Sequence, residues 1–249
     1  MTPEELHNIY QAESGFWWYE GMRAITWALL DACIPRGLST GLDAGCGTGM
    51  NALAFEGRYG IRMHGIDLAP LGIEYCRKRR FRRSAVGSIL MLPFADASFD
   101  LVSSMDVLSH VVPGEDEQAL REFWRVLRPG GWVVLRVPAF SSLRSSHSRF
   151  IAERHRYRSG EMLRKLQLQN FSVIRWTYAN FFLSPVAWFK FRVWENLTRQ
   201  KPVSGVADEF PPWLNRLLLA ALQSEAALIR SGARLPFGQS LLVLARKPL

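Results

Sequence analysis

A glycine-rich turn follows the first predicted strand and is the part of the sequence best suited to holding a ligand. The strand 41–44 runs into Gly45-Cys46-Gly47-Thr48-Gly49, and a helix is predicted from there to about Arg58. Glycines in such a turn let the backbone approach a ligand closely and point its N–H groups at it. A dinucleotide-binding turn would have its third glycine at position 50, which is Met50 here. The spacing therefore argues against NAD.

Two carboxylates flank this turn. Asp43 precedes the glycines and would repel a pyrophosphate, whereas it suits a ligand that carries an ammonium or sulfonium group. Asp67 lies near the end of the second predicted strand, 62–68, about twenty residues beyond the turn, where an acid can accept hydrogen bonds from ribose hydroxyls. Together they predict a cationic ligand with an adenosyl group.

Strands and helices are predicted to alternate around these residues. Beyond the first two strands, the patterns predict strands at 85–89, 99–105, 132–138, 171–180 and 240–246. Helices are predicted before position 40, from about Pro70, at 115–127, at 160–169 with Ser159 as its cap, and from Trp213 to about Ile229. The polar stretch 141–159 is predicted to be an exposed connection. Such alternation is typical of a parallel sheet with right-handed crossovers, and therefore of an α/β fold.

The ordered series of motifs resembles the class I S-adenosylmethionine-dependent methyltransferases, type 11 branch. The resemblance is strong over about 38–140 and rests on four strings: Leu42-Asp43-Ala44-Gly45-Cys46-Gly47-Thr48-Gly49, Gly65-Ile66-Asp67, Leu92-Pro93-Phe94 with Ser98-Phe99-Asp100, and Arg125-Val126-Leu127-Arg128-Pro129-Gly130-Gly131. More loosely, one bacterial subgroup of that family is similar at Phe16-Trp17-Trp18-Tyr19 with Arg23, at His155-Arg156-Tyr157, and at Pro236-Phe237-Gly238 with Ser240-Leu241-Leu242.

The resemblance implies a doubly wound, mostly parallel, seven-stranded Rossmann-like sheet in a single methyltransferase domain over 1–249. In this interpretation 1–37 forms an N-terminal helical cover, and 38–180 with 239–249 forms the sheet core. The remaining 181–238 is a helical insertion before the last strand, and it serves as a lid or substrate region.

The resemblance also implies which residues hold S-adenosylmethionine. Asp67 would hold the ribose and Leu68 would pack on the adenine. The methionine end of the cofactor would be lined by Asp43, Gly45, Gly47 and Gly49.

Three further residues complete the predicted cofactor site. Met105 lies where the family offers a backbone carbonyl to the cofactor ammonium. Ser88 stands where the family usually has an acidic residue, and a hydroxyl can still accept a bond from the adenine, so we expect weaker cofactor binding rather than its loss. Arg23 presents a planar fork that could pair with the cofactor carboxylate, although a surface ion pair is the alternative.

Methyl transfer from a sulfonium needs alignment more than a protein nucleophile, and a general base helps only if the acceptor must lose a proton. His110, a few residues beyond the fourth strand, is the first candidate base, and Asp106 is its rival. The alternative for His110 is a loop histidine bonded to backbone. His155 could also reach the cleft, but most such residues are simply solvated.

Charge and aromatic residues suggest partners. Lysine and arginine number 31 against 22 aspartate and glutamate, a net charge of +9, which favours anionic partners. The basic run 77–83 fits either a solvated helix end or contact with an anionic lipid or phosphate surface, and it lacks the interleaved aromatics that stack on bases. The aromatic residues of 181–238 fit ordinary packing, a lid, a dimer face or a membrane-surface helix. The sequence predicts no oligomeric state.

Three cysteines without metal-ligand spacing argue against both a disulfide framework and a metal site. The acidic start of the chain and the lack of a long uncharged apolar run lead us to expect a protein that is neither exported nor integral, and therefore cytoplasmic, with peripheral membrane contact as an open alternative.

The expected function is methyl transfer from S-adenosylmethionine to a small, apolar or lipid-like acceptor, on oxygen first and then on nitrogen or carbon. One alternative is a non-catalytic S-adenosylmethionine-binding subunit or scaffold. Another is a nucleic-acid methyltransferase, against which the Asn-Pro-Pro-Tyr type of signature is absent after the fourth strand.

Overall fold

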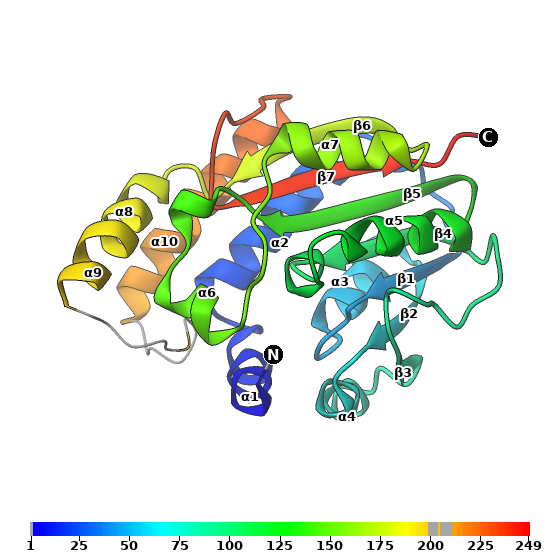
Figure 1. The fold of residues 1–249 in the computed structure, drawn as a ribbon, viewed down its shortest axis with the longest axis horizontal. Helices are drawn as coiled ribbons and strands as arrows, with labels where there is room; N and C mark the ends of the chain where they lie inside the picture. The colour runs from blue at the N-terminus through cyan, green and yellow to red at the C-terminus, as the bar shows by residue number, and fades with distance from the viewer. Residues whose placement is uncertain (1, 199–203, 205–210) are drawn as a thin grey trace.

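A twisted seven-stranded sheet forms the centre of the described part of the chain, which comprises residues 2–198, 204 and 211–249 of a computed structural model (Figure 1). The strands run in the order β3-β2-β1-β4-β5-β7-β6, parallel from β3 to β5, with β7 antiparallel to both of its neighbours. Their bounds are β1 Thr40–Ala44, β2 Arg62–Asp67, β3 Ser84–Val86, β4 Phe99–Met105, β5 Leu127–Pro138, β6 Ser172–Ala179 and β7 Ser240–Arg246. The predicted doubly wound, mostly parallel sheet is confirmed.

Helices cover both faces of the sheet, so its central strands are almost continuously apolar. One face packs against α5 (Glu115–Val126) and α7 (Ser159–Leu168) through buried residues such as Phe123 and Met162. The other packs against α2 (Trp17–Leu30), α3 (Met50–Tyr59), α4 (Pro70–Lys78) and α10 (Pro212–Arg230).

Helices from opposite ends of the chain meet on that second face. α2 packs against α10 so closely that a Cβ on Gly21 would lie 2.3 Å from Leu222 Cδ1. α2 and α10 are therefore a layer of the core, whereas α1 (Pro3–Ala12) lies beside α4 at the edge of the molecule.

The stretch 141–159 differs from its prediction as an exposed connection. It contains the 3₁₀ turn η2 (Ser141–Leu143) and the short helix α6 (Ser146–Phe150). Ser145 and Ser148 form a reciprocal capping box and are buried, so the serines hydrogen-bond the local backbone instead of facing water. Ser159 does not cap α7 either, because its backbone N–H donates to the Tyr178 hydroxyl at 2.9 Å and Arg158 occupies the cap position.

The segment between β6 and α10 forms α8 (Ser184–Phe189), the π-helical turn η3 (Lys190–Trp194) and α9 (Glu195–Leu197). It is tied to α6, because Glu195 Oε2 accepts a 2.6 Å hydrogen bond from the Ser146 backbone N–H. Figure 1 shows α6 and the α8–α9 segment on the side toward which β5 points, the side where open α/β sheets bind ligands. No described helix is both long and apolar enough to cross a membrane.

Candidate functional site

A cavity of about 1000 Å³ lies at the carboxyl ends of the parallel strands. Its floor is formed by the glycine turn after β1 and by the ends of β2, β4 and β5, and it is covered by α1, α6 and α8 with η3. Small-ligand sites usually measure roughly 300–1,000 Å³. The cavity is therefore large enough for two ligands in contact.

Backbone conformation explains the glycines of the turn. Gly45 and Gly47 line the cavity with φ values of 90° and 52°, in the left-handed region that side chains disfavour. A Cβ on Gly45 would lie 2.3 Å from Val107, whereas a Cβ on Gly47 would meet nothing within 4 Å. Gly49 has φ 85°, caps α3 and is not among the lining residues. The turn thus exposes backbone rather than side chains at Gly47.

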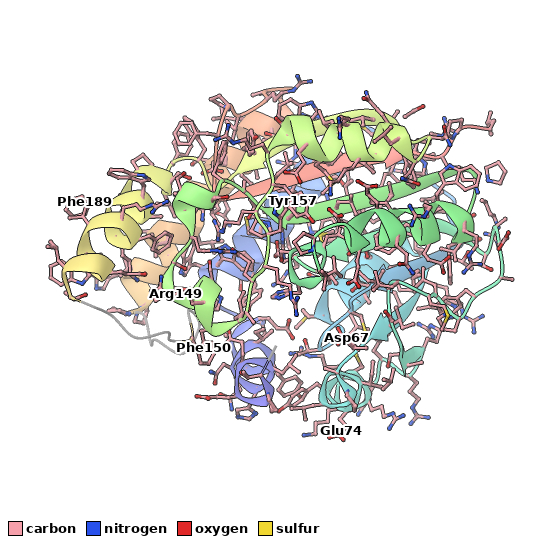
Figure 2. All side chains as sticks on the ribbon, viewed as in Figure 1. Asp67, Glu74, Arg149, Phe150, Tyr157 and Phe189 are labelled. Atoms are coloured by element: carbon pink, nitrogen blue, oxygen red, sulfur yellow. The ribbon has the colours of Figure 1, made fainter. Side chains whose placement is uncertain are left out.

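Asp67 connects this turn to the end of β2, where Figure 2 labels it. Its Oδ2 accepts from the Gly47 N–H and its Oδ1 from the Ala69 N–H, both at 2.8 Å. Each carboxylate oxygen keeps a second lone pair, so Asp67 can also accept from a ligand hydroxyl. The neighbouring Leu68 lines the cavity with 74% of its surface exposed, as an apolar platform beside the acid.

Asp43 is buried, and the structure does not place it on the cavity wall. Its Oδ1 accepts a 2.7 Å hydrogen bond from Ser103 Oγ, while its Oδ2 is buried without a partner in the described chain. Burial raises the pKa of Asp43 to about 7, against the hydrogen bond from Ser103. A carboxyl group with one unpartnered oxygen therefore lies next to the turn, and a cation bound nearby would favour its ionised form.

Ser88, two residues after the end of β3, and Met105, the last residue of β4, both line the cavity. Ser88 Oγ accepts from the Leu90 N–H at 3.1 Å, so its hydroxyl is turned partly toward its own loop.

Arg23, predicted to meet a ligand carboxylate, is not among the residues that line the cavity. Its Nη2 donates to the Glu13 backbone carbonyl at 3.0 Å. Arg136 on β5 lines the cavity instead: its Nε donates to Asp106 Oδ2 at 2.7 Å, and its guanidinium lies over the Trp18 ring at 4.9 Å. Arg136 was not predicted from the sequence, where its signal is an arginine inside an otherwise apolar strand.

His110 and Asp106 both line the cavity, next to Met105. His110 ends the 3₁₀ turn η1 (Leu108–His110), and burial lowers its pKa, against the effects of Asp106 and Glu153 and of a hydrogen bond with the Ala152 backbone. A ring bonded on one side keeps its other nitrogen available. Asp106 has φ 61° and its Oδ2 is engaged by Arg136.

His155 is not a lining residue. Its Nε2 lies 2.8 Å from Glu161 Oε1, so it forms a surface pair with α7 rather than reaching the cavity.

Two cations of the basic run 77–83 are used internally. Arg79 pairs with Glu13 at 2.8 Å and also donates to the Tyr10 carbonyl, and Arg83 pairs with Glu56. The run contains six cations, and these two ion pairs reduce the positive charge that it can offer to a partner.

Away from the glycine turn, apolar residues line one wall of the cavity, and polar residues such as His147 and Lys190 also face the space there. The apolar wall consists of Trp17 of α2, Leu218 of α10, and Leu183, Val186, Ala187 and Phe191 of the α8 region. Above it, the carboxylate of Glu5 on α1 lies 3.8 Å from His147 Nδ1 on α6.

Comparison with known proteins identifies the domain that has this geometry. Residues 42–135 match the family model described as a methyltransferase domain, which spans β1 to β5 with the glycine turn and Asp67. Residues 42–135 therefore form a methyltransferase domain of the class I S-adenosylmethionine-dependent family. The predicted family and its cofactor, S-adenosylmethionine, are thereby confirmed.

Curated relatives of this methyltransferase are similar over part of their length. The O-methyltransferase cnsE of Penicillium expansum is 33% identical over 101 residues, which are 38% of this chain and 36% of that protein. The malonyl-[acyl-carrier protein] O-methyltransferase of Serratia marcescens is 36% identical over 103 residues, 41% of this chain and 39% of that protein. The chain thus spans less than half the length of these relatives.

Solved structures share the fold over most of the methyltransferase chain. A putative sarcosine dimethylglycine methyltransferase from Galdieria sulphuraria has a TM-score of 0.59 at 20% identity and covers 91% of this chain and 86% of its own. A geranyl diphosphate methyltransferase in complex with GPP and sinefungin has a TM-score of 0.59 at 17% identity, covering 91% and 77%.

Proposed function

We propose that this methyltransferase transfers a methyl group from S-adenosylmethionine to a small, apolar or lipid-like acceptor, on oxygen in the first instance and otherwise on nitrogen or carbon. The observation that carries the proposal is the continuity of the cavity. The same space that meets Gly47 and Asp67 extends to the apolar wall of Leu183, Ala187 and Phe191.

The residues of the turn fit the cofactor. Gly47 leaves open space where a side chain would project, Asp67 keeps lone pairs for ribose hydroxyls, and Asp43 has an unpartnered oxygen that a nearby cation would compensate. When bound, S-adenosylmethionine supplies the electrophilic methyl group on its sulfonium. The protein then contributes alignment and exclusion of water.

His110 is the residue that we assign as the general base. Its lowered pKa keeps the imidazole neutral at neutral pH, and His110 lines the cavity. Asp106 is the weaker candidate, since Arg136 already engages its Oδ2.

The class of acceptor rests on the cavity wall and on the relatives. Burying the apolar surface of a substrate against apolar side chains is favourable by roughly 25 cal/mol per Å² removed from water. The relatives named as O-methyltransferases support oxygen as the acceptor atom.

The proposal is tested by incubating the protein and S-adenosylmethionine carrying a labelled methyl group with fractionated lipid, apolar-metabolite and RNA extracts. Label in a lipid or apolar-metabolite fraction supports it. Label in RNA would favour a nucleic-acid methyltransferase, and cofactor binding with no labelled fraction would favour a non-catalytic subunit.

Peripheral contact with an anionic membrane surface belongs to the same proposal. On α8, Trp188 is 49% exposed and Phe189 56% exposed, next to the exposed Lys190, and Figure 2 shows Phe189 on the outer side of the helix. Aromatic rings beside cations suit a lipid interface. Sedimentation with anionic but not with neutral vesicles, lost in the variant Trp188→Ala with Phe189→Ala, is the expected result, and equal sedimentation of both proteins would contradict it.

A further inference from the structure

We propose that Arg136 is the carboxylate receptor of the cavity and that its ligand is the methionine carboxylate of S-adenosylmethionine. The inference rests on the proposed function and assigns a role to a residue that neither the motifs nor the comparisons single out.

The first argument is the way in which the guanidinium is held. Arg136 is 5% exposed although it lines the cavity. Asp106 binds its Nε at 2.7 Å, and Trp18 stacks against its face at 4.9 Å. Neither of its Nη atoms has a hydrogen-bond partner among the described residues, and neither is sealed from the cavity. A rigidly placed pair of N–H donors is thus left for a ligand.

The second argument is the match of shape and charge. Two terminal guanidinium nitrogens form parallel hydrogen bonds with the two oxygens of a carboxylate, a geometry that a lysine or an amide cannot reproduce. Asp106 occupies the Nε side only, so one anion is accommodated at the fork. Burial lowers the pKa of Arg23, and Arg136 contributes to that lowering. The two guanidinium groups therefore repel each other, and a bound anion would reduce this repulsion.

The third argument distinguishes the cofactor from the acceptor. Arg136 is the register partner of Met105 on β4, and its carbonyl accepts from the Asp106 N–H at 2.7 Å. Met105 is the position at which the cofactor ammonium is expected. Because the ammonium and carboxylate of an amino acid share one carbon, the receptor for one should lie beside the receptor for the other.

Contacts on the α2 side agree with this placement. Trp18 precedes Tyr19, whose pKa is raised by burial and by Glu13, among other carboxylates. Glu13 in turn accepts a hydrogen bond from Thr48 of the glycine turn. Arg136 itself is among the groups that lower the pKa of Asp43, against the larger effect of burial, so its guanidinium lies near the start of the glycine turn.

The experiment compares two ligands by calorimetry, S-adenosylhomocysteine and its decarboxylated analogue, in the wild-type protein and in Arg136→Gln. The matched control is Arg164→Gln, which changes an exposed arginine on α7 outside the cavity. Hydrogen bonds to charged groups contribute about 1.5–3 kcal/mol, so we expect Arg136→Gln to weaken binding of S-adenosylhomocysteine by roughly 10- to 100-fold. The analogue should bind the wild type and Arg136→Gln alike, and Arg164→Gln should leave both affinities unchanged.

Three results would overturn the inference. An equal loss for both ligands would assign Arg136 a structural role. The double variant Arg136→Gln with Asp106→Asn checks this, because it also removes the charge that Arg136→Gln leaves unpaired on Asp106. Unchanged binding of S-adenosylhomocysteine to Arg136→Gln would exclude the cofactor carboxylate as its ligand. Binding of neither ligand to the wild-type protein would instead reject the proposed function itself.

Discussion

The Gly47 backbone N–H donates a 2.8 Å hydrogen bond to Asp67 Oδ2, so the turn after β1 and the end of β2 are joined directly. One lone pair of Asp67 fixes the turn, a second accepts from the Ala69 N–H, and the remaining lone pairs are available to a ligand. The separation of the two residues in the sequence is bridged because β1 and β2 are parallel neighbours in the sheet.

Gly47→Ala should weaken cofactor binding. Gly47 has φ 52° and faces open space, so a methyl group would both strain the turn and enter the site. We expect at least a tenfold loss of affinity for S-adenosylhomocysteine in calorimetry. Gly57→Ala is the matched control, since Gly57 lies within α3 with nothing near its Cβ position, and it should bind normally. Equal binding by both variants would contradict the account of the turn.

Cofactor binding should release a proton through Asp43. The pKa of Asp43 is raised to about 7 by burial, and a cationic ligand nearby favours the ionised form, so the pKa must fall when the ligand binds. Protons are therefore released below about pH 7, and the affinity should rise as the pH increases toward 7. Calorimetry at pH 6.5 in two buffers of different ionisation enthalpy measures the release. Asp43→Asn should remove it, and an unchanged release in that variant would assign the proton to another group.

His110→Gln should lower the rate of methyl transfer on the order of a hundredfold if His110 is the base. Because burial lowers its pKa, the wild-type rate should stay constant from neutral pH upward and fall only at a pH below the 6.5 of an ordinary histidine. The pH–rate profile with the accepting fraction checks this. Asp106→Asn serves as the comparison, and full activity of His110→Gln with a loss in Asp106→Asn would reverse the assignment.

Ala187→Trp should block the acceptor and spare the cofactor. Ala187 lies in the apolar wall, so an indole there would fill the space that we assign to the acceptor. We expect a rise of at least tenfold in the KM for the accepting fraction with unchanged affinity for S-adenosylhomocysteine. Leu168→Trp, at an exposed position on α7, is the control. A parallel loss of cofactor binding in Ala187→Trp would show that the wall belongs to the cofactor.

Strand bounds could be predicted from the sequence where the residues themselves set the pattern. β4 (Phe99–Met105) and β7 (Ser240–Arg246) have the predicted limits, because buried strands between turn residues read as short apolar runs. The turn and Asp67 could be located because they are local in sequence and their chemistry follows from their position at strand ends.

The remaining features depend on tertiary contacts that no local pattern contains. Arg136 interrupts an apolar strand in the sequence, but its place at the cavity depends on its contacts with Trp18 of α2 and with Asp106. Arg23 has the guanidinium group that could pair with the cofactor carboxylate, but its Nη2 donates to the Glu13 carbonyl. The serines of 141–159 are typical of a loop, yet Ser145 and Ser148 are buried and form the capping box of α6. The neighbouring Ser146 donates its backbone N–H to Glu195 of α9, a contact that the local sequence does not reveal.

Asp67→Ala is the change that tests the account most directly, measured by calorimetry with S-adenosylhomocysteine. Loss of the ribose acceptor together with the bond to Gly47 should cost about 3 kcal/mol or more, which is at least a hundredfold in affinity. Asp96→Ala is the control, because the Asp96 side chain is 77% exposed; it should bind as the wild type does. The account predicts no measurable binding for Asp67→Ala with its thermal unfolding still cooperative, and wild-type affinity in that folded variant would contradict it.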